Sequence, residues 1–165
     1  MRLYLVRHGI AVDPEDPKCP PDPKRHLTPE GIKKTRAAMR GLAAMGATVD
    51  AMFSSPYLRA AQTAEIAADV LGFPADKIAA TDALLPGASA GALLKELAKV
   101  GGDDVMCFGH APHLDIFLAH CVGSRSQITE LKKAGVACLE MGKLSAGGGI
   151  LVWLLSSKAL RQLAE

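Results

Sequence analysis

The stretch Leu3-Tyr4-Leu5-Val6-Arg7-His8-Gly9 near the N-terminus indicates the fold of this 165-residue chain. Four apolar residues in a row suit a buried strand, and the run ends abruptly in an arginine and a histidine. The glycine that follows marks a loop. The sequence therefore predicts a core strand over residues 3–6 with polar side chains at its carboxyl end.

The same order of strand, turn and helix recurs twice along the chain. Residues 51–53 precede Ser55-Pro56, and residues 105–108 precede Gly109-His110-Ala111-Pro112. A proline suits the first position of a helix, where its missing N–H is harmless. We therefore expect Ser55 to cap a helix over residues 57–71, and a second helix to run from Pro112 to Cys121.

The remaining segments complete an alternating pattern of helices and strands. Thr28-Pro29 begins a helix that should run to Ala44 and stop at Gly46, whereas five prolines make residues 13–24 an irregular excursion. The other expected elements are strands over 78–80, 136–141 and 150–155 and helices over 90–100 and 158–164. This alternation predicts a three-layer α/β/α fold with a mostly parallel central sheet.

Composition excludes several classes of protein. With 49% apolar and 22% charged residues, the chain should form a single domain over residues 1–165. A net charge of +2 without a basic run argues against nucleic acid. The longest uncharged stretch, residues 144–157, is too short to span a membrane, and the N-terminal apolar run is too short for a signal peptide. We expect a cytoplasmic protein with four reduced cysteines and no membrane contact.

The polar residues at three strand ends suggest a shared anion site. Arg7 and His8, Arg59, and His110 follow the first three apolar strands, and ligands of open α/β sheets bind outside the carboxyl ends of the strands. Two guanidinium groups and helix N-termini suit a phosphoryl group. His8 is the candidate nucleophile: neighbouring arginines lower its pKa, one ring nitrogen must donate to a fixed acceptor, and Gly9 permits close backbone approach.

Five motifs together resemble the histidine phosphatase (phosphoglycerate-mutase-like) superfamily, and in particular its small SixA-type phosphohistidine phosphatases. They are Leu-Tyr-Leu-Val-Arg-His-Gly, residues 25–31, residues 54–64, Gly109-His110-Ala111-Pro112, and residues 132–135. The resemblance implies a phosphoglycerate-mutase-like fold and a catalytic group. In it His8 accepts the phosphoryl group, Arg7 and Arg59 clamp its oxygens, and His110 stabilises the transferring group. We expect His110 to be protonated in the transition state. It also places Arg25 against substrate or phosphate.

One departure from that superfamily concerns the leaving group. Larger members carry a carboxylate that protonates it, where this chain has Leu84-Leu85-Pro86, and the nearby Asp82 is offset. General acid catalysis is typically worth 10²–10⁴-fold, so its absence favours a phosphoramidate, whose imidazole leaves more readily than an alkoxide. The predicted substrate is thus phosphohistidine on a partner protein.

Alternative interpretations stay open for the function and for several residues. A small-molecule phosphomonoesterase, a mutase-type enzyme, or a module that binds phosphorylated partners without turnover would fit the same cluster. His113, one helical turn after His110, is placed to border the substrate. We predict no metal and no cofactor, because no His-x-x-x-His pair with a nearby carboxylate stands at the predicted site, and we expect a monomer. Cys19 and Arg25 match the C-x₅-R phosphatase signature, but Pro20, Pro21 and Pro23 remove the N–H donors that such a loop needs.

Overall fold

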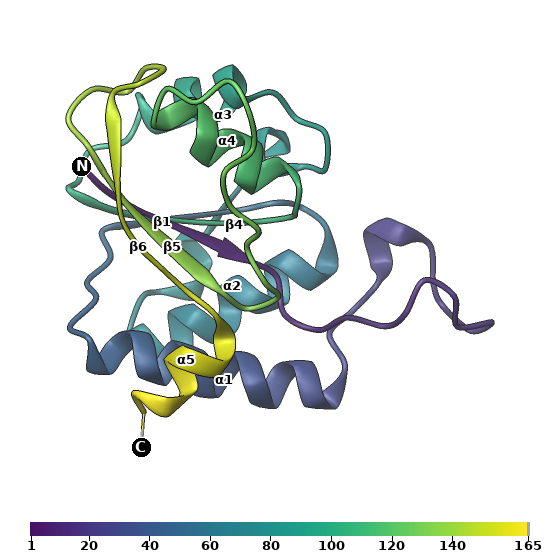
Figure 1. The fold of residues 1–165 in the computed structure, drawn as a ribbon. Helices are drawn as coiled ribbons and strands as arrows, with labels where there is room; N and C mark the ends of the chain where they lie inside the picture. The colour runs from purple at the N-terminus through teal and green to yellow at the C-terminus, as the bar shows by residue number, and fades with distance from the viewer. Residues whose placement is uncertain (165) are drawn as a thin grey trace.

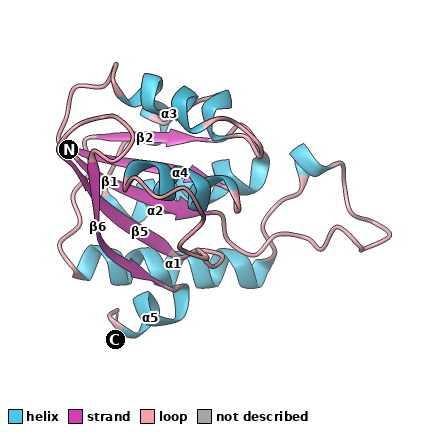
Figure 2. Ribbon diagram, turned by 45° about the horizontal axis from the view of Figure 1, so that its top comes forward, coloured by secondary structure: helices cyan, strands magenta, loops and turns pink. Residues whose placement is uncertain are grey.

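One six-stranded sheet forms the centre of the computed structural model, which describes residues 1–164 (Figures 1 and 2). The strands β1 to β4 pair in parallel, and β5 and β6 add an antiparallel edge. The predicted, mostly parallel sheet is confirmed. In the order β3-β2-β4-β1-β5-β6, the strands are β3 Ala79–Ala80, β2 Ala51–Ser54, β4 Asp104–Gly109, β1 Arg2–Arg7, β5 Val136–Met141 and β6 Gly149–Leu155.

The sheet separates two hydrophobic cores, and β1 contributes to both. Leu3 and Leu5 pack in the core beneath α3 (Ala90–Leu97) and α4 (His113–Cys121). Tyr4 and Val6 pack in the core on the opposite face, covered by helices α1 (Pro29–Ala44), α2 (Leu58–Leu71) and α5 (Ser157–Gln162). Burial on both faces explains why this strand is continuously apolar. The predicted three-layer architecture is confirmed.

Helix α1 begins and ends as predicted. The hydroxyl of Thr28 accepts a hydrogen bond from the Gly31 amide at 3.0 Å, and Pro29 occupies the first helical turn. Its last residue is Ala44, and Gly46 follows with a positive φ of 78°. A Cβ atom at Gly31 would lie only 2.0 Å from the Ile10 carbonyl oxygen. Glycine at this position therefore lets the first turn of α1 pack against the loop that follows β1.

The turns before α2 and α4 differ from the prediction. Helix α2 begins at Leu58 with Tyr57 as its N-cap, and no side chain caps it. The predicted capping role of Ser55 is wrong, because its hydroxyl contacts His110 and the amide of Tyr57. Pro112 is the N-cap of α4 instead of its first helical residue.

Two other helices differ in their ends. Helix α3 ends at Leu97, short of the predicted residue 100, because the chain tightens and the Val100 amide donates to the Leu97 carbonyl. Helix α5 spans Ser157–Gln162 instead of residues 158–164, because the Ser156 side chain caps it. None of the helices within residues 1–164 is both long and apolar enough to cross a membrane.

The proline-rich excursion leaves the body of the protein and returns beside the carboxyl end of β1 (Figure 1). Its one regular turn is the short 3₁₀ helix η1 (Asp22–Lys24), which agrees with the predicted irregular stretch. Ala11 and Leu27 form a single antiparallel bridge across its base. The excursion is thereby held where η1 contacts α2 at the functional site.

Candidate active site

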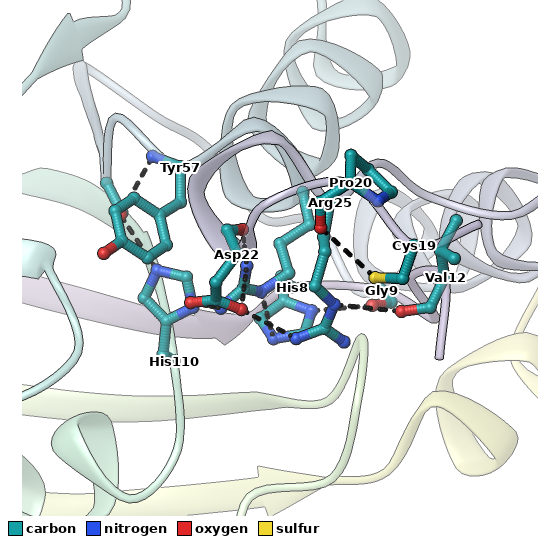
Figure 3. A network of polar contacts seen from close by, with 11 residues as sticks. His8, Gly9, Val12, Cys19, Pro20, Asp22, Arg25, Tyr57 and His110 are labelled. Atoms are coloured by element: carbon teal, nitrogen blue, oxygen red, sulfur yellow. Dashed lines mark hydrogen bonds and ion pairs between the residues drawn. The ribbon is translucent and has the colours of Figure 1, made fainter. Parts of the chain in front are cut away.

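Four predicted side chains come from the carboxyl ends of β1 and β4 and from the first turn of α2. The ring centres of His8 and His110 lie 5.2 Å apart, and Arg59 Nε lies 3.2 Å from His8 Nε2 (Figure 3). Arg7 is the residue before His8, at the end of β1. The structure therefore brings together segments that are about 50 residues apart in the chain, as the strand-end argument predicted.

The hydrogen bonds of His8 define its tautomer. Its Nδ1 lies 2.7 Å from the Gly9 carbonyl oxygen, which can only accept a hydrogen bond, so Nδ1 carries the proton. Its Nε2 accepts a hydrogen bond from Arg59, whose guanidinium can only donate. The ring thus presents the Nε2 lone pair, as a nucleophile requires.

The surroundings of His8 keep the imidazole neutral. Its pKa is lowered to about 4, chiefly by burial and also by the positive charges of Arg59, Arg7 and Lys133, while the bond to the Gly9 carbonyl acts in the opposite direction. The sequence argument identified the arginine charges as the cause, and the structure adds burial as the larger one. A neutral His8 at physiological pH is the form that can attack phosphorus.

Arg59 is nearly enclosed, and all its donor atoms have partners. Its side chain is 5% exposed. Beside the bond to His8, its NH1 donates to the Asp22 carbonyl at 2.8 Å and lies 3.3 Å from Asp22 Oδ1. Its guanidinium also lies over the Tyr57 ring, 5.3 Å from the ring centre. The guanidinium is therefore held in one orientation beside His8.

Asp22 is a site residue that the sequence did not single out. It lies on η1, and its Oδ1 also accepts a hydrogen bond from Arg25 NH1 at 2.9 Å (Figure 3). Although partial burial acts in the opposite direction, the hydrogen bond from Arg25 and the charge of Arg59 hold the pKa of the Asp22 carboxyl below its usual value. Arg25, predicted to contact substrate or phosphate, thus reaches the site through this carboxylate. Its Nε is fixed by the Val12 carbonyl at 2.9 Å.

His110 is buried and contacts Ser55 and Tyr57. Its Nε2 is 2.9 Å from the Ser55 hydroxyl, and its ring meets that of Tyr57 edge-on, with centres 5.4 Å apart. The pKa of His110 is lowered to about 3, chiefly by burial and also by the nearby His8 and Arg59. The phosphate-free site therefore favours the neutral imidazole of His110, and its predicted protonation in the transition state stays a prediction.

Arg7 is positioned through a buried carboxylate. Its NH1 donates to the Leu131 carbonyl at 2.9 Å. The Leu131 amide in turn donates to Asp115 Oδ1 at 2.8 Å, and the Thr129 hydroxyl donates to the same oxygen at 2.7 Å. Asp115 is 1% exposed and lies on α4. Burial lowers the pKa of Arg7, whereas the Asp115 charge raises it. Asp115 was not predicted, since its sequence position on an apolar helix gave no signal.

Comparison with known proteins identifies the family of this site. Residues 3–84 match the family model of the histidine phosphatase superfamily (branch 1). An uncharacterised protein from Picosynechococcus is 34% identical over 146 residues, 86% of each chain. The phosphohistidine phosphatase SixA of Escherichia coli K12 is 26% identical over 161 residues, 94% of each chain. The solved structure of the protein histidine phosphatase SixA with tungstate has a TM-score of 0.82 and 23% identity, covering 97% of this chain and 99% of the other.

The chain belongs to the histidine phosphatase superfamily. The resemblance seen in the sequence and the phosphoglycerate-mutase-like fold are thereby confirmed, and with them the prediction of a phosphatase. The matched residues 3–84 include Arg7, His8 and Arg59, and the last two are in direct contact. His110 joins them from outside the matched range, through the parallel pairing of β4 with β1.

Gly9 has a packing role in this histidine phosphatase. A Cβ atom there would lie 2.2 Å from the Thr35 hydroxyl of α1, so only glycine fits without movement. Its amide donates to the Thr63 hydroxyl at 3.0 Å, and that hydroxyl donates to the Arg59 carbonyl at 2.7 Å. Thr63, another residue missed in the sequence, thus joins the loop of His8 to the helix of Arg59. The predicted contact of Gly9 with substrate stays a prediction.

Three other residues that the sequence analysis considered have different surroundings. His113 is 3% exposed, and within residues 1–164 neither ring nitrogen has a hydrogen-bond partner; its predicted place beside substrate stays a prediction. Asp82 is exposed on η3 (Asp82–Leu84) and lines a surface depression beside α3, in which none of the four catalytic candidates takes part. The thiol of Cys19 donates to the Pro20 carbonyl at 3.3 Å (Figure 3). Its C-x₅-R match forms no phosphate loop, because Arg25 is bound to Asp22 and Val12.

Proposed function

We propose that this histidine phosphatase removes the phosphoryl group from phosphohistidine on a partner protein, through a phosphorylated His8. The observation that carries the proposal is the geometry of His8. Its Nδ1–H is bound to Gly9 and its Nε2 lone pair faces the guanidinium of Arg59. This arrangement places a neutral nucleophile next to a group that binds phosphoryl oxygens.

The reaction takes two displacements. In the first, His8 Nε2 forms a bond to phosphorus as the P–N bond of the substrate breaks, and the released imidazole takes a proton from solvent. In the second, water attacks phosphorus, the bond to Nε2 breaks, and inorganic phosphate leaves with the water-derived oxygen. Arg59 and Arg7 stabilise the charge on the equatorial phosphoryl oxygens in both steps. The Nδ1–H bond to Gly9 holds the ring in the same tautomer throughout.

The preference for a P–N bond follows from the ionisation of the carboxylate at the site. Asp22 contacts Arg59 and Arg25, which keep it ionised, so it has no proton to give to an alkoxide leaving group. Asp82 lines a surface depression in which none of the four catalytic candidates takes part. Phosphohistidine needs less assistance, and transfer to His8 exchanges one P–N bond for another. The similarity to the Escherichia coli phosphohistidine phosphatase supports the same substrate class.

His110 has a role that depends on the bound phosphoryl group. It is neutral in the free site, and its Nε2 is paired with the Ser55 hydroxyl. A dianion bound between His8 and Arg59 offsets the positive charge of Arg59 and raises the proton affinity of the imidazole. His110 then donates a hydrogen bond to a phosphoryl oxygen in the transition state.

Trapping of the intermediate tests the proposal. During turnover of a histidine-phosphorylated peptide, rapid quenching should yield a +80 Da adduct on His8 that is stable in alkali and lost in acid. The His8→Ala variant should show neither adduct nor turnover, whereas His26→Ala, which alters an exposed histidine outside the cluster, should retain both. A kcat/KM for sugar phosphates that exceeds the value for phosphohistidine would instead establish a phosphomonoesterase.

A further inference from the structure

A second, basic pocket adjoins the proposed active site at the carboxyl end of β1. It has a volume of about 490 Å³ and lies between α1, α5 and the loop that precedes β5. These two helices pack side by side below the sheet (Figure 1). Arg7 belongs to both places: it precedes His8 in the chain, and it lines this pocket. A molecule whose phosphoryl group reaches His8 therefore has the surface around that group close to the pocket.

The lining of this pocket is much more positively charged than the protein as a whole. The chain carries only +2, yet the pocket is lined by five cationic side chains and one carboxylate, that of Glu130. Glu130 is paired with Lys132, and Glu30 outside the lining pairs with Lys34. Within residues 1–164, no carboxylate lies within 4 Å of the other three cations. These three are Arg7, Lys133 and Arg161.

Three residues that line the pocket also have buried polar atoms without hydrogen-bond partners among the described residues. Thr35 is fully buried, and its hydroxyl has no hydrogen-bond partner among the described residues. The same is true of the buried Arg7 Nε and of the Ser157 hydroxyl. Buried polar groups are usually paired, so three residues of one pocket leave hydrogen-bonding capacity unused. Positively charged hydrogen-bond donors together with hydroxyl groups suit a carboxylate ligand.

We propose that this basic pocket docks carboxylate side chains of the protein that carries the phosphohistidine. The inference rests on the proposed function, because the partner reaches the pocket only when its phosphohistidine is bound at His8. The pocket is larger than a single carboxylate needs, and its cations come from four separate chain segments. Such a spread suits several acidic side chains on one surface, which also raise the rate of encounter.

Two matched peptides and one charge-reversal variant test this proposal. The peptides share a central phosphohistidine and differ in flanking residues, which are glutamates in one and glutamines in the other. Wild-type enzyme should show a kcat/KM about tenfold higher for the glutamate peptide, and this preference should decline with salt. In the double variant Lys34→Glu with Arg161→Glu, which spares the four catalytic candidates, the preference should vanish. Lys77→Glu with Lys95→Glu, two exposed lysines on other elements, should keep it.

Each other outcome decides against the docking site or against the function. Equal kcat/KM for the two peptides in wild type, or an equal fall for both in the double variant, would overturn docking. A tenfold loss of kcat/KM in the double variant for 3-phosphoglycerate alone would assign the pocket to the carboxylate of a small substrate. That result would also overturn docking of a protein partner. If neither peptide is hydrolysed, the proposed function fails. Fluorescence anisotropy with a labelled, unphosphorylated glutamate peptide then tests docking separately: wild type must bind it, and the double variant must bind it at least tenfold more weakly.

Discussion

Arg59 Nε donates a hydrogen bond to His8 Nε2 across 3.2 Å, so in the free site the guanidinium covers the lone pair that would attack phosphorus. A phosphoryl group entering between the two side chains takes over this donor. In the proposed mechanism Arg59 is therefore both a clamp for the substrate and the group that hydrogen-bonds to His8 when no substrate is bound. The two roles require the planar guanidinium with its Nε, which lysine lacks.

Replacement of this guanidinium should impair catalysis strongly. Arg59→Lys keeps the charge but loses the bonds of Nε and the second NH group, and charge-assisted hydrogen bonds contribute about 1.5–3 kcal/mol each. We expect kcat/KM to fall at least about 10²-fold. Steady-state kinetics with a phosphohistidine peptide measures this, and Arg40→Lys, at an exposed position on α1, is the control. Activity within threefold of wild type would contradict the clamp role.

The Asp22 carboxylate should compete with phosphate for Arg59. It lies 3.3 Å from Arg59 NH1, and an anion bound there must displace it or share the guanidinium. Asp22→Asn removes the negative charge, so the inhibition constant of inorganic phosphate should decrease several-fold, by an energy on the order of 1 kcal/mol. Inhibition kinetics measures the change, with Asp76→Asn as an exposed control. Weaker inhibition by phosphate in Asp22→Asn would show that the carboxylate instead organises the site.

The pH profile should report a neutral His8. Burial lowers its pKa to about 4, below the 6.5 of an ordinary imidazole. Protonation removes the lone pair, so activity is present above this pKa and is lost as the pH falls through it. The acid limb of kcat/KM, which reflects the free enzyme, should lie near pH 4, and NMR titration of the His8 ring should give the same midpoint. A midpoint between 6 and 7 in both measurements would rule out this electrostatic environment.

Asp115 should act through the loop that holds Arg7. Asp115→Ala leaves the Leu131 amide and the Thr129 hydroxyl without their acceptor, at a cost of about 1–3 kcal/mol for a buried donor. We expect lower stability in urea and a lower kcat. Asp115→Asn keeps one acceptor oxygen and should recover most of the stability. A loss of stability in Asp115→Ala with unchanged kcat would limit the residue to a structural role.

Gly9 should be coupled to Thr35. A Cβ atom at position 9 would lie 2.2 Å from the Thr35 hydroxyl, so Gly9→Ala must displace that side chain or the backbone, which typically costs about 1–3 kcal/mol. Removing the hydroxyl in Gly9→Ala with Thr35→Ala should restore part of this loss relative to Thr35→Ala alone. Urea unfolding of the four proteins measures the coupling. Additive losses would show that the clash is relieved elsewhere.

The sequence by itself determined the elements and their order, because those depend on local pattern. The apolar run of residues 3–6, the cap and proline at Thr28 and Pro29, and the glycine at position 46 each act within a few residues. The strand-end rule then placed Arg7, His8, Arg59 and His110 together, since it requires only topology.

Only the tertiary structure decided how those side chains are held and charged. Asp22 and Arg59 are 37 residues apart in the chain, and Arg7 and Leu131 are 124 residues apart, so no local sequence pattern indicates either contact. The state of His110 depended on the same information: a strand-end histidine beside arginines does not reveal how deeply it is buried. Burial removes solvent from the charged form, and it can be known only once the chain is folded.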